Sequence, residues 1–381
     1  MSKTEFLLSE VSNIISVKAP ISEASLDNYI STENMLPDFG GVIKAEKLPV
    51  ANSVNTFLNG DILFSNIRTY FKKVWSSKFN GTVSPDVLVF RANENKCTNK
   101  YLYYTLCNPE FIELSILTSK GAKMPRGDKD AMLKYTFSLP SLPEQHAIAE
   151  VLSCLDDKID LLHRNNKTLE EMAETLFRQW FVEGAKEDWE VKTLGTLVST
   201  IVDNRGKTPP TVEFNTGMPL IEVNALNSKS CCVNYSVIRK FVTEETYNSW
   251  FRKHLAVKDI IFSTVGSIGI FSLLMKQEGV IAQNVVGLRC SSPFFFYLWL
   301  KSNVEVILSL DIGGVQPSIK LPHLLGLEAK VPADSMLNKF ENQVEHIFQK
   351  IRMNEEQIAS LTILRDTLLP KLMSGQVRVN H

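Results

Sequence analysis

A pattern of apolar residues that occurs twice constrains the fold of this chain more than any other feature. Between residues 142 and 183, apolar side chains recur alternately four and three positions apart, which is the spacing of a coiled-coil seam. The same alternation returns 192 positions further along the chain. The seam positions are Ile148, Leu152, Leu155, Ile159, Leu162, Asn166, Leu169, Ala173, Leu176 and Trp180 in the first stretch, and Phe340, Val344, Ile347, Ile351, Asn354, Ile358, Leu361, Arg365, Leu368 and Leu372 in the second. Two such helices in one chain are expected to pack against each other.

The duplication extends beyond the two helices. At the same offset, residues 121–125 (GAKMP) align with residues 313–317 (GGVQP). Further upstream, residues 61–65 (DILFS) match residues 259–263 (DIIFS) at an offset of 198. Self-similarity over such distances indicates that a whole structural unit is repeated. Each half of the chain is therefore predicted to be a globular domain followed by a long helix.

Both globules mix short apolar runs with turn sequences, which predicts strands as well as helices. We expect an α+β fold with two duplicated globules separated by two long helices, which form an antiparallel coiled coil with a pseudo-twofold axis. The second helix should end near residue 368, because Pro370 cannot continue it. The predicted segments are 1–141 for the first globule, 142–183 for the central helix, 184–333 for the second globule, and 334–381 for the distal helix with the C-terminal tail.

The seam contains one asparagine in each helix. If the helices pack antiparallel with their seams centred on each other, Asn166 lies opposite Asn354. A buried asparagine pair would fix the register of the two helices at some cost in stability. The alternative is that each side chain points to solvent at a loose part of the seam.

Cysteine content and the N-terminal sequence bear on the compartment. The chain of 381 residues contains 6 cysteines and no CxxC pair, so neither a zinc site nor a disulfide framework is indicated. The N-terminus lacks a basic region followed by an apolar run, and no apolar stretch is long enough to span a bilayer. We expect a cytoplasmic protein without a membrane segment.

The net charge of −1 gives no overall indication of nucleic-acid binding. The distribution of charge is more informative than the sum. Residues 62–85 contain Arg68, Lys72, Lys73 and Lys78 and no acidic residue, whereas the first long helix is rich in acids. If the globules are basic and the helices acidic, the net charge of the whole chain would be close to zero.

Three stretches in and before the first long helix resemble one known family. They are LPSLPEQHAIAEVL at residues 139–152, LDDKID at 155–160 and ETLFRQWFV at 174–182. Together they are similar to the DNA-specificity subunit of Type I restriction-modification systems, and the resemblance covers the whole chain. Residues 121–126 (GAKMPR) and 204–209 (NRGKTP) are also similar to segments common in that family.

This resemblance implies a non-catalytic subunit that recognises double-stranded DNA. Each globule would be a target-recognition domain that reads one half of a bipartite site, and the helices would set the length of the unread spacer. Two methyltransferase subunits would dock on the helices, and restriction subunits would join that core. The resemblance places S-adenosylmethionine, ATP and magnesium only on the partner subunits.

The residues themselves show no catalytic or metal site. A methyltransferase would need a glycine-rich cofactor turn and an N/D-P-P-Y/F motif, and residues 108–111 (NPEF) lack the second proline. Asp311 and residues 328–330 are spaced like a nuclease core but have no counterpart in the first half. Two alternatives stay open: a self-contained methyltransferase or endonuclease without recognisable motifs, and a duplicated protein-interaction scaffold.

Polar and basic residues at the ends of predicted elements are the candidates for DNA contact. Lysines would mostly bind phosphates, whereas Arg, Asn and Gln are suited to base edges in the major groove. The alternative for each residue is an ordinary solvated surface position. The candidates are Arg68, Tyr70, Lys72, Lys73, Lys120, Lys123 and Arg126 in the first globule, and Asn204, Arg205, Lys207, Thr208, Gln283, Asn284, Gln316 and Lys320 in the second.

Overall fold

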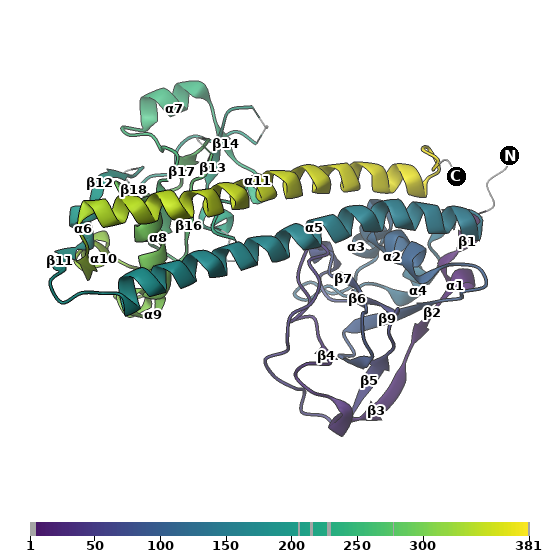
Figure 1. Cartoon of the computed structure of the whole chain (residues 1–381). Helices are drawn as coiled ribbons and strands as arrows, with labels where there is room; N and C mark the ends of the chain where they lie inside the picture. Colours follow the sequence, from purple (N-terminus) through teal and green to yellow (C-terminus); the bar gives the residue numbers. More distant parts are fainter. Residues whose placement is uncertain (1–4, 205, 214–215, 227–229, 277, 380–381) are drawn as a thin grey trace. The chain divides into compact units, whose positions relative to one another are not determined.

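The chain forms two compact units, of which the first joins two segments that are distant in the sequence (Figure 1). The computed structural model describes residues 5–204, 206–213, 216–226, 230–276 and 278–379. Unit 1 comprises Met1–Lys158 and Leu361–His381, and unit 2 comprises Ile159–Ser360. The long helices α5 (Leu142–Phe177) and α11 (Asp334–Met373) each contribute residues to both units.

Helix α5 begins at the predicted residue but ends at Phe177, and a π-helical turn carries the helical run on to the predicted end at Glu183. Pro143 lies in its first turn, where a missing N–H costs no intrahelical hydrogen bond. Beyond α5 the chain continues as a π-helical turn, Arg178–Glu183, and the Gly184 amide donates to the Gln179 carbonyl at 3.0 Å. A Cβ atom at position 184 would lie 2.7 Å from that carbonyl oxygen, so only glycine allows this close approach.

The predicted end of the second long helix is wrong, because α11 continues through Pro370 to Met373. Proline in a helix interior costs about 3 kcal/mol. In the last turn this cost is offset, because Leu369, Leu372 and Met373 are all buried in the core of unit 1. Burying such side chains stabilises by about 2 kcal/mol each. The burial of three apolar side chains therefore outweighs the proline.

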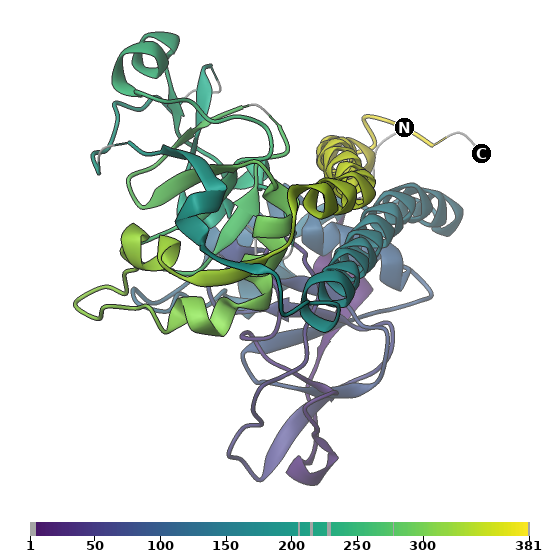
Figure 2. The same ribbon diagram turned by 60° about the vertical axis from the view of Figure 1, so that its left-hand side comes forward.

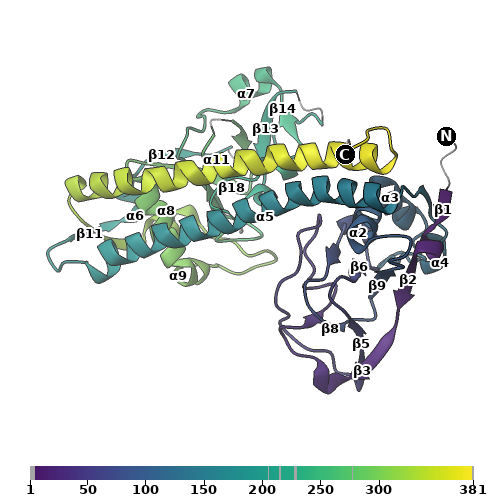
Figure 3. The same cartoon turned by 45° about the vertical axis from the view of Figure 1, so that its right-hand side comes forward.

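Within each unit, α5 and α11 pack antiparallel. In unit 2, Phe177 of α5 lies against Phe340 at the start of α11, with ring centroids 6.3 Å apart. In unit 1, the end of α11 returns to the first half of α5, where Arg365 Nη1 binds Asp156 Oδ1 at 3.0 Å. Figures 2 and 3 show the same pairing of the helices from two further directions. The predicted seam positions are buried or half-buried.

The two seam asparagines meet within unit 2. Asn354 Nδ2 donates to Asn166 Oδ1 at 2.7 Å, and Asn166 Nδ2 donates to Glu355 Oε1 at 2.8 Å. Both asparagines are almost fully buried, with 2% and 1% of Asn166 and Asn354 exposed. That this pair fixes the register of the helices stays a prediction.

Asn354→Ala should lower the free energy of unfolding by about 1–3 kcal/mol, because the buried Asn166 carbonyl loses its donor. Replacing both asparagines with leucine should recover most of this loss, since no buried polar group is then left unpaired. Urea denaturation of the single and double variants measures both effects. A single variant as stable as the wild type would contradict this account.

Unit 1 contains two four-stranded sheets, in the orders β2-β9-β6-β7 and β3-β5-β8-β4, and the antiparallel pair β1-β10. Its elements are β1 (Glu5–Leu7), α1 (Leu8–Val11), β2 (Ser12–Ile15), β3 (Val17–Pro20), β4 (Tyr29–Ile30), β5 (Ser53–Phe57), β6 (Ile62–Ser65), β7 (Val74–Ser76), β8 (Gly81–Val83), β9 (Val87–Ala92), α2 (Asn99–Cys107), α3 (Pro109–Leu117), α4 (Lys129–Leu133) and β10 (Thr136–Ser138). Helices α2 and α3 lie between α5 and the strands β6 and β9 (Figure 3).

Unit 2 repeats the first of these sheets in the order β12-β18-β15-β16, and it repeats the antiparallel pair as β11-β19. Its elements are β11 (Glu190–Thr193), α6 (Leu194–Leu197), β12 (Val198–Val202), β13 (Met218–Ile221), β14 (Phe241–Val242), α7 (Glu244–Trp250), β15 (Ile260–Ser263), β16 (Phe271–Leu273), β17 (Val280–Ile281), β18 (Val285–Cys290), α8 (Pro293–Ser302), α9 (Val304–Leu308), α10 (Leu321–Leu325) and β19 (Glu328–Val331). A three-stranded sheet, β14-β13-β17, completes the unit.

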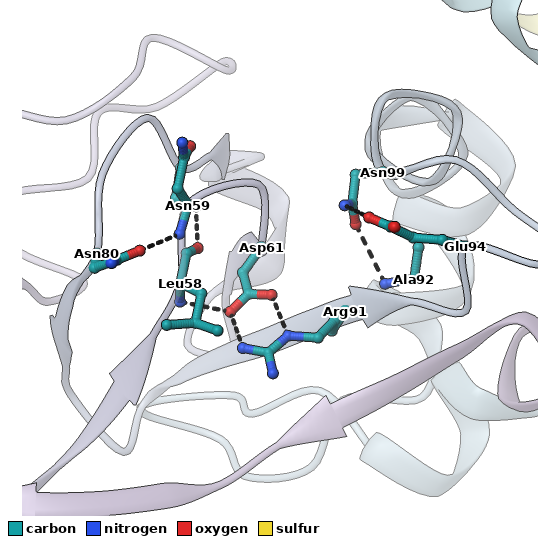
Figure 4. A network of polar contacts seen from close by, with 9 residues as sticks. Leu58, Asn59, Asp61, Asn80, Arg91, Ala92, Glu94 and Asn99 are labelled. Carbon is teal, nitrogen blue, oxygen red and sulfur yellow. Dashed lines mark hydrogen bonds and ion pairs between the residues drawn. The ribbon is translucent and has the colours of Figure 1, made fainter.

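The duplication extends to individual hydrogen bonds. In unit 1, Arg91 Nε and Nη2 each donate to the buried Asp61 carboxylate at 2.7 Å (Figure 4). In unit 2, the same two nitrogens of Arg289 donate to Asp259 at 2.8 Å. Each carboxylate also accepts a backbone N–H from the residue three positions before it. The predicted tandem repeat is thus present in side-chain chemistry as well as in strand order.

Candidate nucleic-acid interface

In unit 1, two loops at one end of the sheet are held together by backbone hydrogen bonds. The turn after β6, residues 66–73, contacts the loop of residues 119–128. The Arg68 amide donates to the Pro125 carbonyl at 2.8 Å, and the Gly127 amide donates to the Asn66 carbonyl at 3.0 Å. This pairing places two segments that are distant in the sequence on one surface.

The structure brings most of the candidate residues of unit 1 to these two loops. Arg68 Nη2 lies 3.4 Å from the Lys123 carbonyl oxygen, so the side chain of one loop reaches the backbone of the other. Lys120 and Arg126 face each other across the second loop and exchange two backbone hydrogen bonds of 2.8 and 2.9 Å. Tyr70 and Lys72 are exposed at the tip of the turn. The result is a basic surface on a backbone that is held in place.

Lys73 differs from its neighbours. Its Nζ donates to the Thr32 carbonyl at 2.6 Å and lies 5.7 Å from the centre of the Phe71 ring. Burial lowers the pKa of its ammonium group. These contacts hold the Lys73 ammonium group within unit 1. It is therefore less available to a phosphate than the ammonium group of Lys72.

Three acidic residues pair with the basic surface. Lys120 Nζ lies 2.6 Å from Asp128, Arg126 Nη2 lies 2.8 Å from Asp86, and Lys72 Nζ lies 3.9 Å from Asp38. The hydrogen bond from Lys120, assisted by backbone N–H donors, lowers the pKa of Asp128. Exposed ion pairs of this kind contribute little to stability, so a DNA phosphate can compete for each of these cations.

The turn after β6 has an uncommon backbone conformation. A short 3₁₀ turn, Thr69–Phe71, is flanked by Arg68 with φ of 50° and Lys72 with φ of 52°. Both residues are in the left-handed region, which costs a residue with a Cβ atom on the order of 1 kcal/mol. The turn is therefore strained at two positions that carry cationic side chains.

In unit 2, three candidate residues line one recess of about 460 Å³. They are Thr208, Gln283 and Asn284, and the Thr208 hydroxyl lies 3.2 Å from Gln283 Oε1. Another part of the wall carries the ion pair between Lys240 and Glu222, at 2.8 Å. The recess thus presents amide, hydroxyl and charged groups, which are the groups that hydrogen-bond base edges.

Gln316 and Lys320 belong to a neighbouring loop of unit 2. This loop packs against the turn after β15 in the way seen in unit 1, because the Gly266 amide donates to the Pro317 carbonyl at 2.9 Å. The Thr264 amide in turn donates to the Asn284 carbonyl at 2.9 Å, which connects this turn to the recess. Backbone contacts through this turn therefore link the loop of Gln316 and Lys320 to Asn284.

Asn204 has a different environment from the other candidates. It is 2% exposed, its Nδ2 donates to the Ile281 carbonyl at 3.2 Å, and its Oδ1 accepts the Gly206 amide at 3.2 Å. Its amide group therefore shapes the loop that presents the exposed Lys207. Arg205 lies outside the described residues.

Sequence reasoning missed Phe71, Asn224 and Lys240. Phe71 is 40% exposed beside Tyr70, and the aromatic-basic run YFKK at residues 70–73 could have indicated it. Asn224 and Lys240 line the recess. No motif marks these two residues, because only the folded chain brings them close to Thr208.

All six cysteines are free thiols, and four of them are buried. Among the described residues, no three His, Cys, Asp or Glu side chains gather closely enough to hold a metal ion. None of the described helices has the length and apolar character required to cross a bilayer.

Comparisons with known proteins agree with this architecture. A family model described as the Type I restriction modification DNA specificity domain matches residues 3–171 and again residues 186–347. The chain is 27% identical over 309 residues to the Type I restriction enzyme MjaIX specificity subunit of Methanocaldococcus jannaschii, covering 74% of this chain and 70% of that protein. It is 23% identical over 403 residues to the HindI specificity subunit of Haemophilus influenzae, covering 84% and 86%.

A solved structure shows the same fold. The crystal structure of the Type-I restriction-modification system S subunit from M. genitalium matches with a TM-score of 0.59 at 17% sequence identity, covering 97% of this chain and 96% of that chain. The family model accounts for both halves of the chain, and the curated relatives are named as specificity subunits. This protein therefore belongs to the Type I restriction-modification DNA-specificity family, as a non-catalytic specificity subunit with two DNA-specificity domains.

Proposed function

We propose that the globule of each unit reads one half of a bipartite site in double-stranded DNA. The observation that carries this proposal is the duplicated surface at the end of each sheet. The turn after β6 is bonded to the loop at Pro125, and the turn after β15 is bonded to the loop at Pro317 in the same way, at 2.8 and 2.9 Å. Loops held on a rigid scaffold are suited to recognition. Two equivalent surfaces would serve two half-sites.

The long helices are suited to set the distance between the half-sites. Helix α5 has 36 residues and α11 has 40 residues. At about 1.5 Å per residue these helices are roughly 55–60 Å long, which exceeds one duplex turn of about 35 Å. Each helix contributes to both units, so a change in helix length should change the separation of the readers. We assign residues 1–141 and 184–333 to the readers, and 142–183 and 334–381 to the spacer.

The helices also offer a surface for partner subunits. Large apolar side chains on α5 and α11 stay exposed, including Met172 at 50%, Met353 at 55% and Ile363 at 68%. Large apolar side chains left exposed on a helix are available to a protein partner. We assign this surface to two methyltransferase subunits, which would recruit restriction subunits and carry S-adenosylmethionine, ATP and magnesium. The complex would act in the cytoplasm, where its DNA substrate is found.

A selection from randomised duplexes tests the proposed function. The purified chain with its methyltransferase subunits should enrich sites made of two short defined sequences separated by a spacer of fixed length. Failure to enrich any sequence would favour a protein-interaction scaffold instead. DNA modification by the chain without added subunits would favour a self-contained enzyme.

Inserting one heptad into both α5 and α11 should lengthen the selected spacer by about three base pairs. Seven residues add roughly 10 Å of helix, and base pairs are about 3.4 Å apart. Insertion into both helices keeps the two seams in phase, whereas insertion into α5 alone should disrupt the pairing and weaken binding. The same selection measures the spacer, and an unchanged length would contradict the role of the helices.

A further inference from the structure

Backbone strain in unit 1 is concentrated at one place. Five non-glycine residues in the described part of the chain have positive φ, and four of them are Asp38, Phe39, Arg68 and Lys72. These four belong to two turns that are hydrogen-bonded to each other. The Asp38 amide donates to the Phe71 carbonyl at 2.9 Å, and the Phe39 amide donates to the Lys72 carbonyl at 3.0 Å. Clusters of strained residues are typical of functional sites.

The equivalent turn of unit 2 shows that the fold does not require this strain. It lies between β15 and β16 and has positive φ at Gly266 (85°) and Gly269 (70°). Gly266 corresponds to Arg68, because both amides donate to the proline carbonyl of the adjoining loop. Glycine adopts this conformation without steric cost. The first turn therefore keeps charged side chains at positions where glycine would relieve the strain.

The strained turn presents two aromatic rings to solvent. Tyr70 is 47% exposed and Phe71 is 40% exposed, and their ring centroids lie 4.7 Å apart with 49° between the ring planes. Lys73 supports the Phe71 ring from within the unit. Arg68 and Lys72 flank the pair in the sequence. Two adjacent rings flanked by cations match the arrangement by which proteins stack on bases while holding phosphates.

Building on the proposed function, we propose that Tyr70 and Phe71 form an aromatic wedge that stacks on a base of one half-site at an opened base step. Arg68 and Lys72 bind the phosphates on either side of that step. Opening a base step costs free energy, which stacking of the wedge on the base can offset. A wedge that is already rigid loses little conformational freedom on binding, so more of the stacking free energy is kept. The flanking cations favour DNA over a protein partner as the occupant. This inference identifies the residues by which unit 1 recognises DNA.

Alanine at Tyr70 or Phe71 should weaken binding to the selected split-site duplex by about 5- to 100-fold, the range expected from loss of one stacked base. Phe71→Trp should retain binding, whereas Phe71→Leu, which keeps apolar area but lacks a ring, should not. Val50→Ala, at an exposed apolar residue elsewhere in unit 1, is the matched control and should bind normally. Binding is measured by fluorescence anisotropy with the assembled complex.

A second variant separates a recognition role from a structural one. Arg68→Gly should raise Tm by about 2 °C, because the strain is relieved. The same variant should weaken DNA binding and reduce the slope of log affinity against log salt by about one, as expected for one lost phosphate contact. Lower Tm together with weaker binding would show that Arg68 is structural, and unchanged binding would show that it does not touch DNA; either result overturns the proposal.

The outcomes distinguish this inference from the function on which it rests. If the wild-type complex enriches no split site, the proposed function fails. If it enriches a site that the Tyr70 and Phe71 variants bind as tightly as the wild type, only the wedge fails. Variants that lose assembly with the methyltransferase on size-exclusion chromatography would assign the rings to a protein interface and would also overturn the wedge.

Discussion

Phe340→Ala should lower the free energy of unfolding of unit 2 by about 4 kcal/mol, the cost of removing a fully buried aromatic ring. Phe340 has no exposed surface and lies where α11 meets α5. Its ring centroid is 4.7 Å from that of Phe181, 5.8 Å from that of Trp180 and 6.3 Å from that of Phe177. Alanine would leave a cavity bordered by three rings that cannot all move inward.

Urea denaturation of Phe340→Ala measures this loss, and hydrogen exchange in unit 2 locates it. Met353→Ala is the matched control, because Met353 lies on the same helix but is 55% exposed. Its substitution should change the free energy of unfolding by less than about 0.5 kcal/mol. Equal unfolding midpoints for Phe340→Ala and the control would show that α11 does not depend on this aromatic cluster.

Asp61→Ala should lower the free energy of unfolding of unit 1 by about 3 kcal/mol. The Asp61 carboxylate is 2% exposed, binds two nitrogens of Arg91 and accepts the Leu58 amide. Removing one partner of a buried ion pair typically costs about 3–5 kcal/mol. The lower end applies because the Arg91 side chain is 35% exposed and can regain water.

The duplicated structure supplies a second measurement and a control. Asp259→Ala should destabilise unit 2 by a similar amount, because Asp259 makes the same bonds to Arg289 and to the Ala256 amide. Asp27→Ala removes an exposed ion pair with Lys44 and should have little effect. Hydrogen exchange should rise in β6 and β9 for the first variant, and in β15 and β18 for the second. A large loss from one variant and none from the other would show that the two networks are not energetically equivalent.

The sequence predicted the long helices well because their seams are periodic over many turns. It did not predict how wide the buried stripe is. Phe177 and Phe181 fall outside the predicted seam, yet both are buried, because the end of α5 and the π-helical turn after it pack on the core of unit 2 as well as on α11. The extension of α11 through Pro370 was missed for the same reason, since the burial of Leu372 and its neighbours depends on a core assembled from distant segments.

The candidate interface was predicted at the level of loops but not of individual side chains. The sequence does not distinguish a loop lysine in a long, exposed ion pair, such as Lys72 with Asp38, from one whose head group is bound to a carbonyl, such as Lys73. Asn204 looked suited to base reading, and its burial follows from a contact with Ile281 that no local pattern encodes. The strained φ of Arg68 was equally hidden, because neither arginine nor lysine is a signature of left-handed backbone.

The discontinuity of unit 1 has a consequence for the order of events at the ribosome. Its core contains Ile148 and Leu152 from the first half of the chain and Leu369, Leu372 and Met373 from the last turns of α11. The first globule therefore has to wait for the last turns of α11, which are translated much later, before its apolar surface is covered. A nascent chain that stops before the last turns of α11 would carry a defect in the globule made from residues 1–141, so synthesis through α11 is itself a condition for completing the first globule.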